Sequence, residues 1–276
     1  MTVAVVTDSS SRIPQDVCER WAIHQAPLHI LIDGTDLRVG VDEIPDDVYK
    51  RPATTAAVTP AELSAAYRRA LAGSDGDGVV AVHMSSGLSG TWRAAELAAA
   101  EFGSAVRVID SKSAAMGTGF TALAAARAAR SGADLDAVAG VATAAVARTH
   151  AYIVVRRLDN LRRSGRLGGA KAWLGTALAL KPLLVIDEGE LVLAQRIRTA
   201  KAAIAVMLDE VCDTVADGAA ALAVHHVADP EGAREVAAAL AERLPQCEPA
   251  IVTPLGPALA VHVGAGALAV CLQLAE

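Results

Sequence analysis

Short apolar runs alternate with longer helical stretches through the first half of the chain, and this alternation restricts the fold more than any other feature. Four runs are rich in β-branched residues and end in turn residues: TVAVVT (2–7), PLHILI (27–32), VVAVHM (79–84) and AVRVID (105–110). A helical pattern follows three of them. Strands that alternate with helices form a parallel sheet with helices on both faces, so we expect an N-terminal α/β domain of three layers.

The pattern changes after two alanine-rich helical stretches, at 115–130 and 134–148. Five further runs are expected to form strands: AYIVV (151–155), KPLLVI (181–186), ELVLA (190–194), AALAVHH (220–226) and AIVTP (250–254). The turn DEGE (187–190) joins two of them as a hairpin, which requires antiparallel pairing. We therefore expect two α/β domains: a three-layer domain over 1–148 and a two-layer domain with a mixed sheet over 149–276.

Composition excludes one large class of function. Of the 276 residues, 53% are hydrophobic but only 3% are aromatic, so the core is aliphatic and offers few rings on which bases stack. The formal net charge of −6 repels a polyanion. Nucleic acid is therefore not expected as a partner.

The chain ends and the cysteines predict a cytoplasmic protein. No basic region precedes the short apolar run at the N-terminus, so a signal peptide is not expected. Residues 249–275 carry no charge and are long enough to cross a bilayer, but prolines, glycines and His262 interrupt them. We expect buried strands and a buried polar loop there, and no membrane span. The four cysteines have no metal-type spacing, and we expect no metal site.

Three hydroxyl-rich loops follow predicted strands of the first half: DSSSR (8–12), SSGLSGT (85–91) and DSKSAAMG (110–117). In open α/β sheets, ligands bind at the carboxyl ends of the strands, where these loops meet. The alternative is that the serines form ordinary helix caps and turns.

The loop SSGLSGT has the composition of an anion site. A helix that starts at Gly90 or Thr91 presents free backbone N–H groups and the positive end of its dipole. The hydroxyls of Ser85, Ser86, Ser89 and Thr91 add further donors for a carboxylate or a phosphate. No G-x-S-x-G motif is present and nothing pairs a histidine with a serine, so no catalytic nucleophile is expected.

Arginines concentrate in RRLDNLRRSGRLGG (156–169), and a second cationic stretch, QRIRTAK (195–201), follows the predicted hairpin. Helical spacing brings Arg156 close to Asp159, so part of the first run forms a solvated, salt-bridged face. Together the two stretches are suited to docking a partner protein.

Several motifs occur in one order over nearly the whole chain: TDSSSRIP, SSGLSGTW, IDSKSAAMGTG, LRRSGRLGG, LALKPLLVI, RTAK and LGPALAVHVGAG. Because of this ordered set of motifs, the chain resembles the DegV family and is similar to the fatty-acid-binding subunit of bacterial fatty acid kinases. The resemblance implies an apolar tunnel between the two domains that holds one fatty acid. It also implies that a separate ATP-dependent kinase subunit phosphorylates the carboxylate. The carrier itself then needs neither catalytic residues nor a cofactor.

The resemblance also implies roles for single residues. Ser89 and the backbone of Gly90 would bind the carboxylate, together with Thr55 and with His262 of the C-terminal motif. Arg166 and Arg198 would face the kinase or the phosphoryl group, since a guanidinium suits phosphate.

Two segments depart from the family pattern. The loop TTAAVTP (54–60) has Ala56 and Ala57 where Ser-Gln is usual, which removes side-chain hydrogen bonds, and Ala265 replaces a usual proline. Two alternatives to the carrier stay open: an autonomous enzyme acting on a small carboxylated or phosphorylated metabolite, and a regulatory module for which the lipid is a signal.

Overall fold

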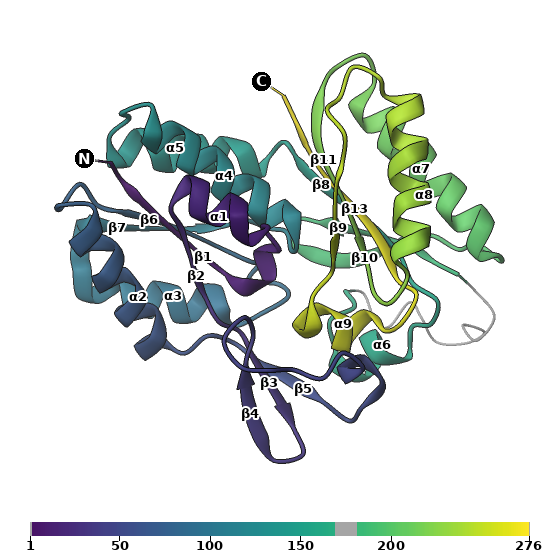
Figure 1. The fold of residues 1–276 in the computed structure, drawn as a ribbon, viewed down its shortest axis with the longest axis horizontal. Helices are drawn as coiled ribbons and strands as arrows, with labels where there is room; N and C mark the ends of the chain where they lie inside the picture. Colours follow the sequence, from purple (N-terminus) through teal and green to yellow (C-terminus); the bar gives the residue numbers. More distant parts are fainter. Residues whose placement is uncertain (1, 169–180, 276) are drawn as a thin grey trace.

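Four parallel strands form the first sheet of the computed structural model, which describes residues 2–168 and 181–275. Their order is β2 (Ile23–Ala26), β1 (Ala4–Asp8), β6 (Val79–His83) and β7 (Val106–Asp110). On one face lie α1 (Gln15–Trp21), α4 (Met116–Arg130) and α5 (Leu135–Val146); on the other lie α2 (Pro60–Gly73) and α3 (Thr91–Ala99) (Figure 1). The predicted three-layer arrangement around a parallel sheet is confirmed. Three short 3₁₀ turns complete this part, at Ser9–Ser11, Val48–Lys50 and Ala100–Ala105.

The run PLHILI was expected in the parallel sheet, and that prediction is wrong. Its residues form β3 (His29–Ile32), which pairs antiparallel with β4 (Thr35–Arg38) and β5 (Thr54–Ala56) in a separate three-stranded sheet. The position next to β1 is taken by β2, whose Ile23 pairs with Val5. Pro27 has no N–H with which to continue that strand, so the chain leaves the parallel sheet there.

Six strands form the second large sheet, in the order β10 (Glu190–Gln195), β9 (Leu183–Asp187), β8 (Thr149–Val154), β13 (Leu268–Leu274), β11 (Ala220–His226) and β12 (Ile251–Pro254). β11 and β12 are parallel, and the other pairs are antiparallel. Helices α7 (Ala200–Val215) and α8 (Pro230–Arg243) cover one face (Figure 1). The mixed sheet is confirmed, as is the hairpin, in which Glu190 pairs with Asp187.

Helix α4 packs against both large sheets, with contacts to β1 and β6 on one side and β8 and β13 on the other. Small residues permit this double packing. A Cβ on Gly119 would lie 2.7 Å from the carbonyl oxygen of Ser11, and one on Gly117 would overlap the side chain of Ser113. The alanine and glycine content of this helix therefore reflects close approach from two directions.

The uncharged C-terminal stretch folds into β12, the short helix α9 (Pro257–Val263) and β13. Among the described residues, no helix is both long and apolar enough to span a bilayer. All four cysteines lie in the described part of the chain and are free thiols. The domain boundary near residue 148 stays a prediction; the first strand of the six-stranded sheet begins at Thr149.

Candidate functional site

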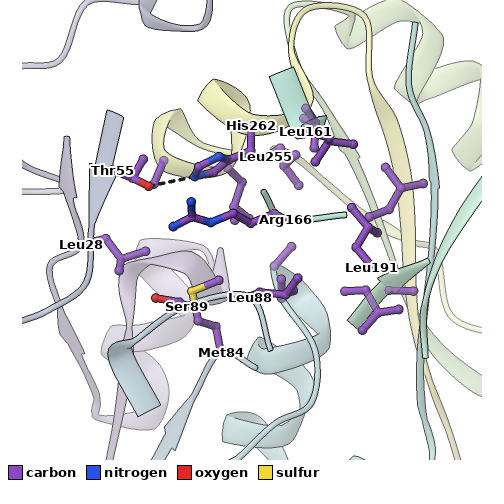
Figure 2. Close-up of a pocket in the computed structure, with 18 of the residues that line it drawn as sticks. Leu28, Thr55, Met84, Leu88, Ser89, Leu161, Arg166, Leu191, Leu255 and His262 are labelled. Atoms are coloured by element: carbon purple, nitrogen blue, oxygen red, sulfur yellow. Dashed lines mark hydrogen bonds between the residues drawn. The ribbon is translucent and has the colours of Figure 1, made fainter. Parts of the chain in front are cut away.

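A largely aliphatic cavity lies where the three sheets meet (Figure 2). The volume of this cavity is about 110 Å³, so the space is narrow. Its walls come from β8, β9, β10 and β13, from the start of α4, and from α6 (Asp159–Ser164) and α9. The apolar lining residues are Leu28, Ala56, Ala57, Met84, Leu88, Ala114, Ala115, Ala151, Ile153, Leu161, Ile186, Leu191, Leu255, Ala258, Leu259, Val263, Ala269 and Cys271.

The polar lining residues gather at one end, which we call the head end: Thr55, Ser89, Gly90, Arg166 and His262. These are five of the six site residues proposed from the sequence. Figure 2 shows Thr55 and His262 on one side and Ser89 on the other, with Arg166 between them. The remaining candidate, Arg198, is exposed in the turn between β10 and α7 and does not line the cavity.

Thr55 and His262 contact each other across 207 positions of sequence. His262 Nε2 lies 2.8 Å from Thr55 Oγ1, with Thr55 on β5 and His262 on α9. Burial and, to a smaller extent, the Arg166 guanidinium lower the pKa of His262 to about 4, so the ring is neutral at pH 7. A carboxylate only accepts hydrogen bonds. The tautomer that suits such a ligand has its proton on Nε2 and donates it to Thr55, which leaves the threonine hydroxyl free to donate.

Ser89 and Gly90 form the entrance to α3, whose first residue is Thr91, as the sequence predicted. The backbone N–H of Thr91 donates to Ser89 Oγ at 3.2 Å, and the two hydroxyls lie 3.0 Å apart. Gly90 has no side chain, so its backbone faces the cavity directly, with the Ala57 methyl opposite. The positive end of α3 therefore points at the head end.

Arg166 is the single charged side chain among the described residues that line the cavity. Helix α6 ends at Gly165, whose φ of 68° is left-handed, and this reversal directs the next residue back toward the cavity. Arg166 donates to the carbonyl oxygen of Ser164 at 2.5 Å. It has no carboxylate partner among the described residues, so its positive charge is available to an anionic ligand.

Most serines of the three hydroxyl-rich loops have structural roles. In the first loop, Ser10 donates to Asp8, and Ser9 accepts from the backbone of Leu28. In the third, Ser111 bonds Thr118 at 2.8 Å. Only the second loop places a hydroxyl on the cavity wall, that of Ser89. The expectation that all three loops supply ligand groups is therefore too broad.

Ser85 joins the second loop to the β9–β10 hairpin. Its hydroxyl donates to the carbonyl oxygen of Gly189 at 2.6 Å, and Lys112 forms an ion pair with Glu188 of the same turn. A Cβ on Gly87 would lie 2.7 Å from that carbonyl oxygen. The absence of a side chain at residue 87 is therefore necessary for this close approach.

Gly87→Ala is expected to lower the free energy of unfolding by about 1–3 kcal/mol, because the added methyl group meets backbone on the hairpin. Urea denaturation measures this. Gly140→Ala is the matched control, since nothing lies within 4 Å of that helical position, and it is expected to be neutral or slightly stabilising. Equal effects of the two substitutions would contradict the contact.

The arginine-rich segment differs in detail from its prediction. Helix α6 begins only at Asp159, so Arg156 lies outside it and pairs with Asp229 at 3.5 Å instead of with Asp159. Arg157 pairs with Asp159 at 2.7 Å. Part of the motif, from residue 169 onward, lies outside the described residues.

The sequence did not single out a buried network behind the cavity wall. Asp8 Oδ2 lies 3.0 Å from His83 Nδ1, and His83 Nε2 lies 3.0 Å from the Tyr67 hydroxyl. Asp8 also accepts from the backbone of Met84, a cavity residue. These contacts fix the start of the loop that carries Ser89. Among the described residues, no three histidine, cysteine, aspartate or glutamate side chains gather as a metal site.

Comparisons with known proteins identify relatives over nearly the whole chain. A family model described as "Uncharacterised protein, DegV family" matches residues 2–274. A DegV domain-containing protein of Mycobacterium tuberculosis is 70% identical over 274 residues, covering 99% of this chain and 98% of that protein.

Solved structures of the same family superpose over the full length. A Thermus thermophilus DegV family protein described by its fatty acid binding is 31% identical, with a TM-score of 0.90 and 100% coverage of both chains. DegV of Bacillus subtilis, described as a fatty acid binding protein, is 30% identical, also with a TM-score of 0.90 and 100% coverage of both. With a family model that matches nearly its whole length, a relative that is 70% identical and a fold in common with these structures, the chain belongs to the DegV family.

Proposed function

We propose that this protein binds one fatty acid, with the acyl chain in the aliphatic cavity and the carboxylate at the head end. The observation that carries the proposal is the cavity itself, where the described lining residues include one charged side chain, that of Arg166, at the head end. Ligand pockets combine an apolar lining with a few polar groups that fix orientation. The fatty acid binding of DegV proteins from Thermus thermophilus and Bacillus subtilis supports the same ligand class.

Each head-end group has a defined role in this proposal. The hydroxyls of Ser89 and Thr55 donate to the carboxylate oxygens, and His262 orients the Thr55 hydroxyl by donating to it. The N-terminal end of α3 at Gly90 and the Arg166 guanidinium supply positive potential. The methyl groups of Ala56 and Ala57 line this end without hydrogen-bonding capacity, so the carboxylate relies on fewer donors.

In this proposal the protein presents the carboxylate of the bound fatty acid to a separate ATP-dependent kinase subunit, which converts it to the acyl phosphate. This reaction takes place in the cytoplasm, where ATP is available. Arg198 is exposed and therefore suited to contact with a partner. Arg166 lines the head end of the cavity, next to the proposed position of the carboxylate. A guanidinium fork matches the oxygens of a phosphoryl group. The role assigned to this chain is binding and presentation, with no catalytic residue of its own.

Native mass spectrometry of the purified protein, followed by denaturation and identification of the released small molecule, tests the proposal. We expect an adduct in the mass range of a fatty acid that is lost on denaturation. A protein that is empty and takes up no added fatty acid would refute it. Activity on a small metabolite without any partner would instead favour the autonomous enzyme.

A further inference from the structure

The end of the cavity opposite the head end is lined by the β9–β10 hairpin. Ile186 of β9 and Leu191 of β10 are a directly opposed pair in this hairpin, and both line the cavity. Figure 2 shows Leu191 on the far side of the cavity from Thr55 and Ser89. We call this pair the tail wall, because an acyl chain bound at the head end extends toward it.

A second, solvent-open groove lies behind the tail wall. Its lining residues include Asp110, Lys112, Thr149, Ile186 and Glu188. Ile186 is the one described residue that lines both this groove and the cavity. Ile186 therefore lies between the aliphatic cavity and a groove that carries charged residues.

One face of β8 connects the two spaces. Alternate residues of a strand share a face, so Thr149, Ala151 and Ile153 point the same way. Ile153 and Ala151 line the cavity, and Thr149 lines the groove. The register that pairs Tyr152 with Val185 puts Ile186 opposite Ala151. Because Ala151 is small, the barrier at this point is formed by the Ile186 side chain.

The tail wall is held in place from the other side. The hairpin turn is tied to the first domain by the Ser85–Gly189 hydrogen bond and the Lys112–Glu188 ion pair. The close approach of Gly87 to Gly189 leaves no gap at the turn. An acyl chain therefore meets a wall whose position is fixed by both sheets.

We propose that Ile186 sets the maximum length of the acyl chain that this protein accepts, an inference that rests on the proposed fatty acid binding. Each methylene moved from water into an apolar cavity strengthens binding about four-fold. This gain ends at Ile186, because a longer chain either folds back or enters the groove. There, Asp110, Lys112 and Glu188 keep the surroundings hydrated, and a methylene gains little.

Competition binding with saturated fatty acids of increasing length tests this proposal. For the wild type, we expect affinity to rise with each carbon up to a limiting length and to fall beyond it. Ile186→Ala removes three carbons from the barrier and is expected to raise that limit by about two carbons. Ala151→Val adds two methyl carbons on β8, opposite Ile186, and is expected to shorten the longest acyl chain that still gains affinity.

Ile204→Ala on α7 is the matched control, because this partly buried isoleucine lines neither the cavity nor the groove. The limiting acyl chain length of the Ile204→Ala variant is expected to equal that of the wild type. If Ile186→Ala and Ala151→Val both bind fatty acids with an unchanged length profile, Ile186 is not the limit, although fatty acid binding stands. If the wild type binds no fatty acid of any length, both the proposed function and this inference are overturned.

Discussion

Replacing Arg166 with glutamine is expected to weaken the binding of a fatty acid about ten- to hundred-fold at pH 7. Arg166 is the single charged side chain among the described residues of the cavity lining, and the ligand carboxylate is an anion that leaves water on binding. Hydrogen bonds to charged groups contribute about 1.5–3 kcal/mol, which corresponds to this range of affinity. Glutamine keeps hydrogen-bonding capacity and removes the charge.

Two controls separate this effect from a change in fold. Arg163→Gln alters a neighbouring arginine that donates to Asn160 and does not line the cavity, so binding is expected to be unchanged. A fatty alcohol of the same chain length has an uncharged head group, so its weaker binding is expected to be nearly independent of Arg166. Titration calorimetry or displacement of a fluorescent fatty acid gives both affinities. An equal loss for acid and alcohol would show that Arg166 acts on cavity shape and not through its charge.

The layered architecture follows from local sequence patterns, and its one misplaced strand has a local cause. The alternation of apolar runs and helical stretches predicts the parallel sheet, and DEGE predicts the hairpin, because both signals lie within a few residues. The run containing Ile30 has the same β-branched character as its neighbours. Only its pairing partner distinguishes it, since Ile30 pairs with Leu37 and Thr55, whereas Ile23 takes the place beside Val5.

The head end was predictable only in part from local composition. Ser89 and Gly90 stand in a serine- and glycine-rich junction at the start of a helix. The site roles of Thr55, Arg166 and His262 came from the family resemblance alone. The 2.8 Å contact between Thr55 and His262 depends on two segments 207 positions apart, which no periodicity relates.

The cavity walls were not predictable residue by residue. Ile153, Ile186 and Leu191 resemble any core residue in the sequence, and whether such a side chain faces a core or a cavity depends on the spacing of the sheets. For the serines the error is the reverse, since two of them were expected in the site and do not line the cavity. Ser10 and Ser111 resemble ligand groups, yet the Ser10 hydroxyl donates to Asp8 of its own loop and the Ser111 hydroxyl bonds Thr118 in α4, because buried polar groups need hydrogen-bond partners.

Acidification from pH 7 to pH 5 is expected to destabilise the fold through two buried histidines. Burial lowers the pKa of His225, which is fully buried, to about 3, with a smaller effect from the Arg12 guanidinium. The pKa of His262 is lowered to about 4, mainly by burial and then by Arg166. In the unfolded chain both rings regain a pKa of about 6.5 and bind a proton at pH 5, while in the folded protein both stay neutral.

The direction of the effect follows from proton binding. Stability rises with pH wherever the unfolded state binds more protons, which for these two histidines is the range between their folded values and about 6.5. Each contributes a loss of about 2 kcal/mol between pH 7 and pH 5. His29 acts in the opposite direction: burial opposes its charged form, but Asp36 and Glu62 outweigh that and raise its pKa. Its contribution to stability is therefore present at pH 5, below the unfolded value of about 6.5, and is lost as the pH rises through the raised folded value. Burial opposes the charged form of Asp8, but His83, Ser10 and the backbone of Met84 outweigh that and lower its pKa. Its contribution to stability is therefore present above about pH 4 and is lost as the pH falls through the lowered folded value.

Urea denaturation at pH 7, 6 and 5 measures this dependence for the wild type and for His225→Gln. Glutamine supplies an oxygen that can accept from the backbone N–H of Met116, as His225 Nε2 does at 3.2 Å, and it does not titrate. The variant is expected to be less stable than the wild type at pH 7 and to lose about 2 kcal/mol less between pH 7 and pH 5. His24→Gln, at an exposed position on β2, is the control and is expected to keep the wild-type slope. If His225→Gln shows that same slope, His225 is not neutral in the folded protein, and the acid sensitivity comes from other groups.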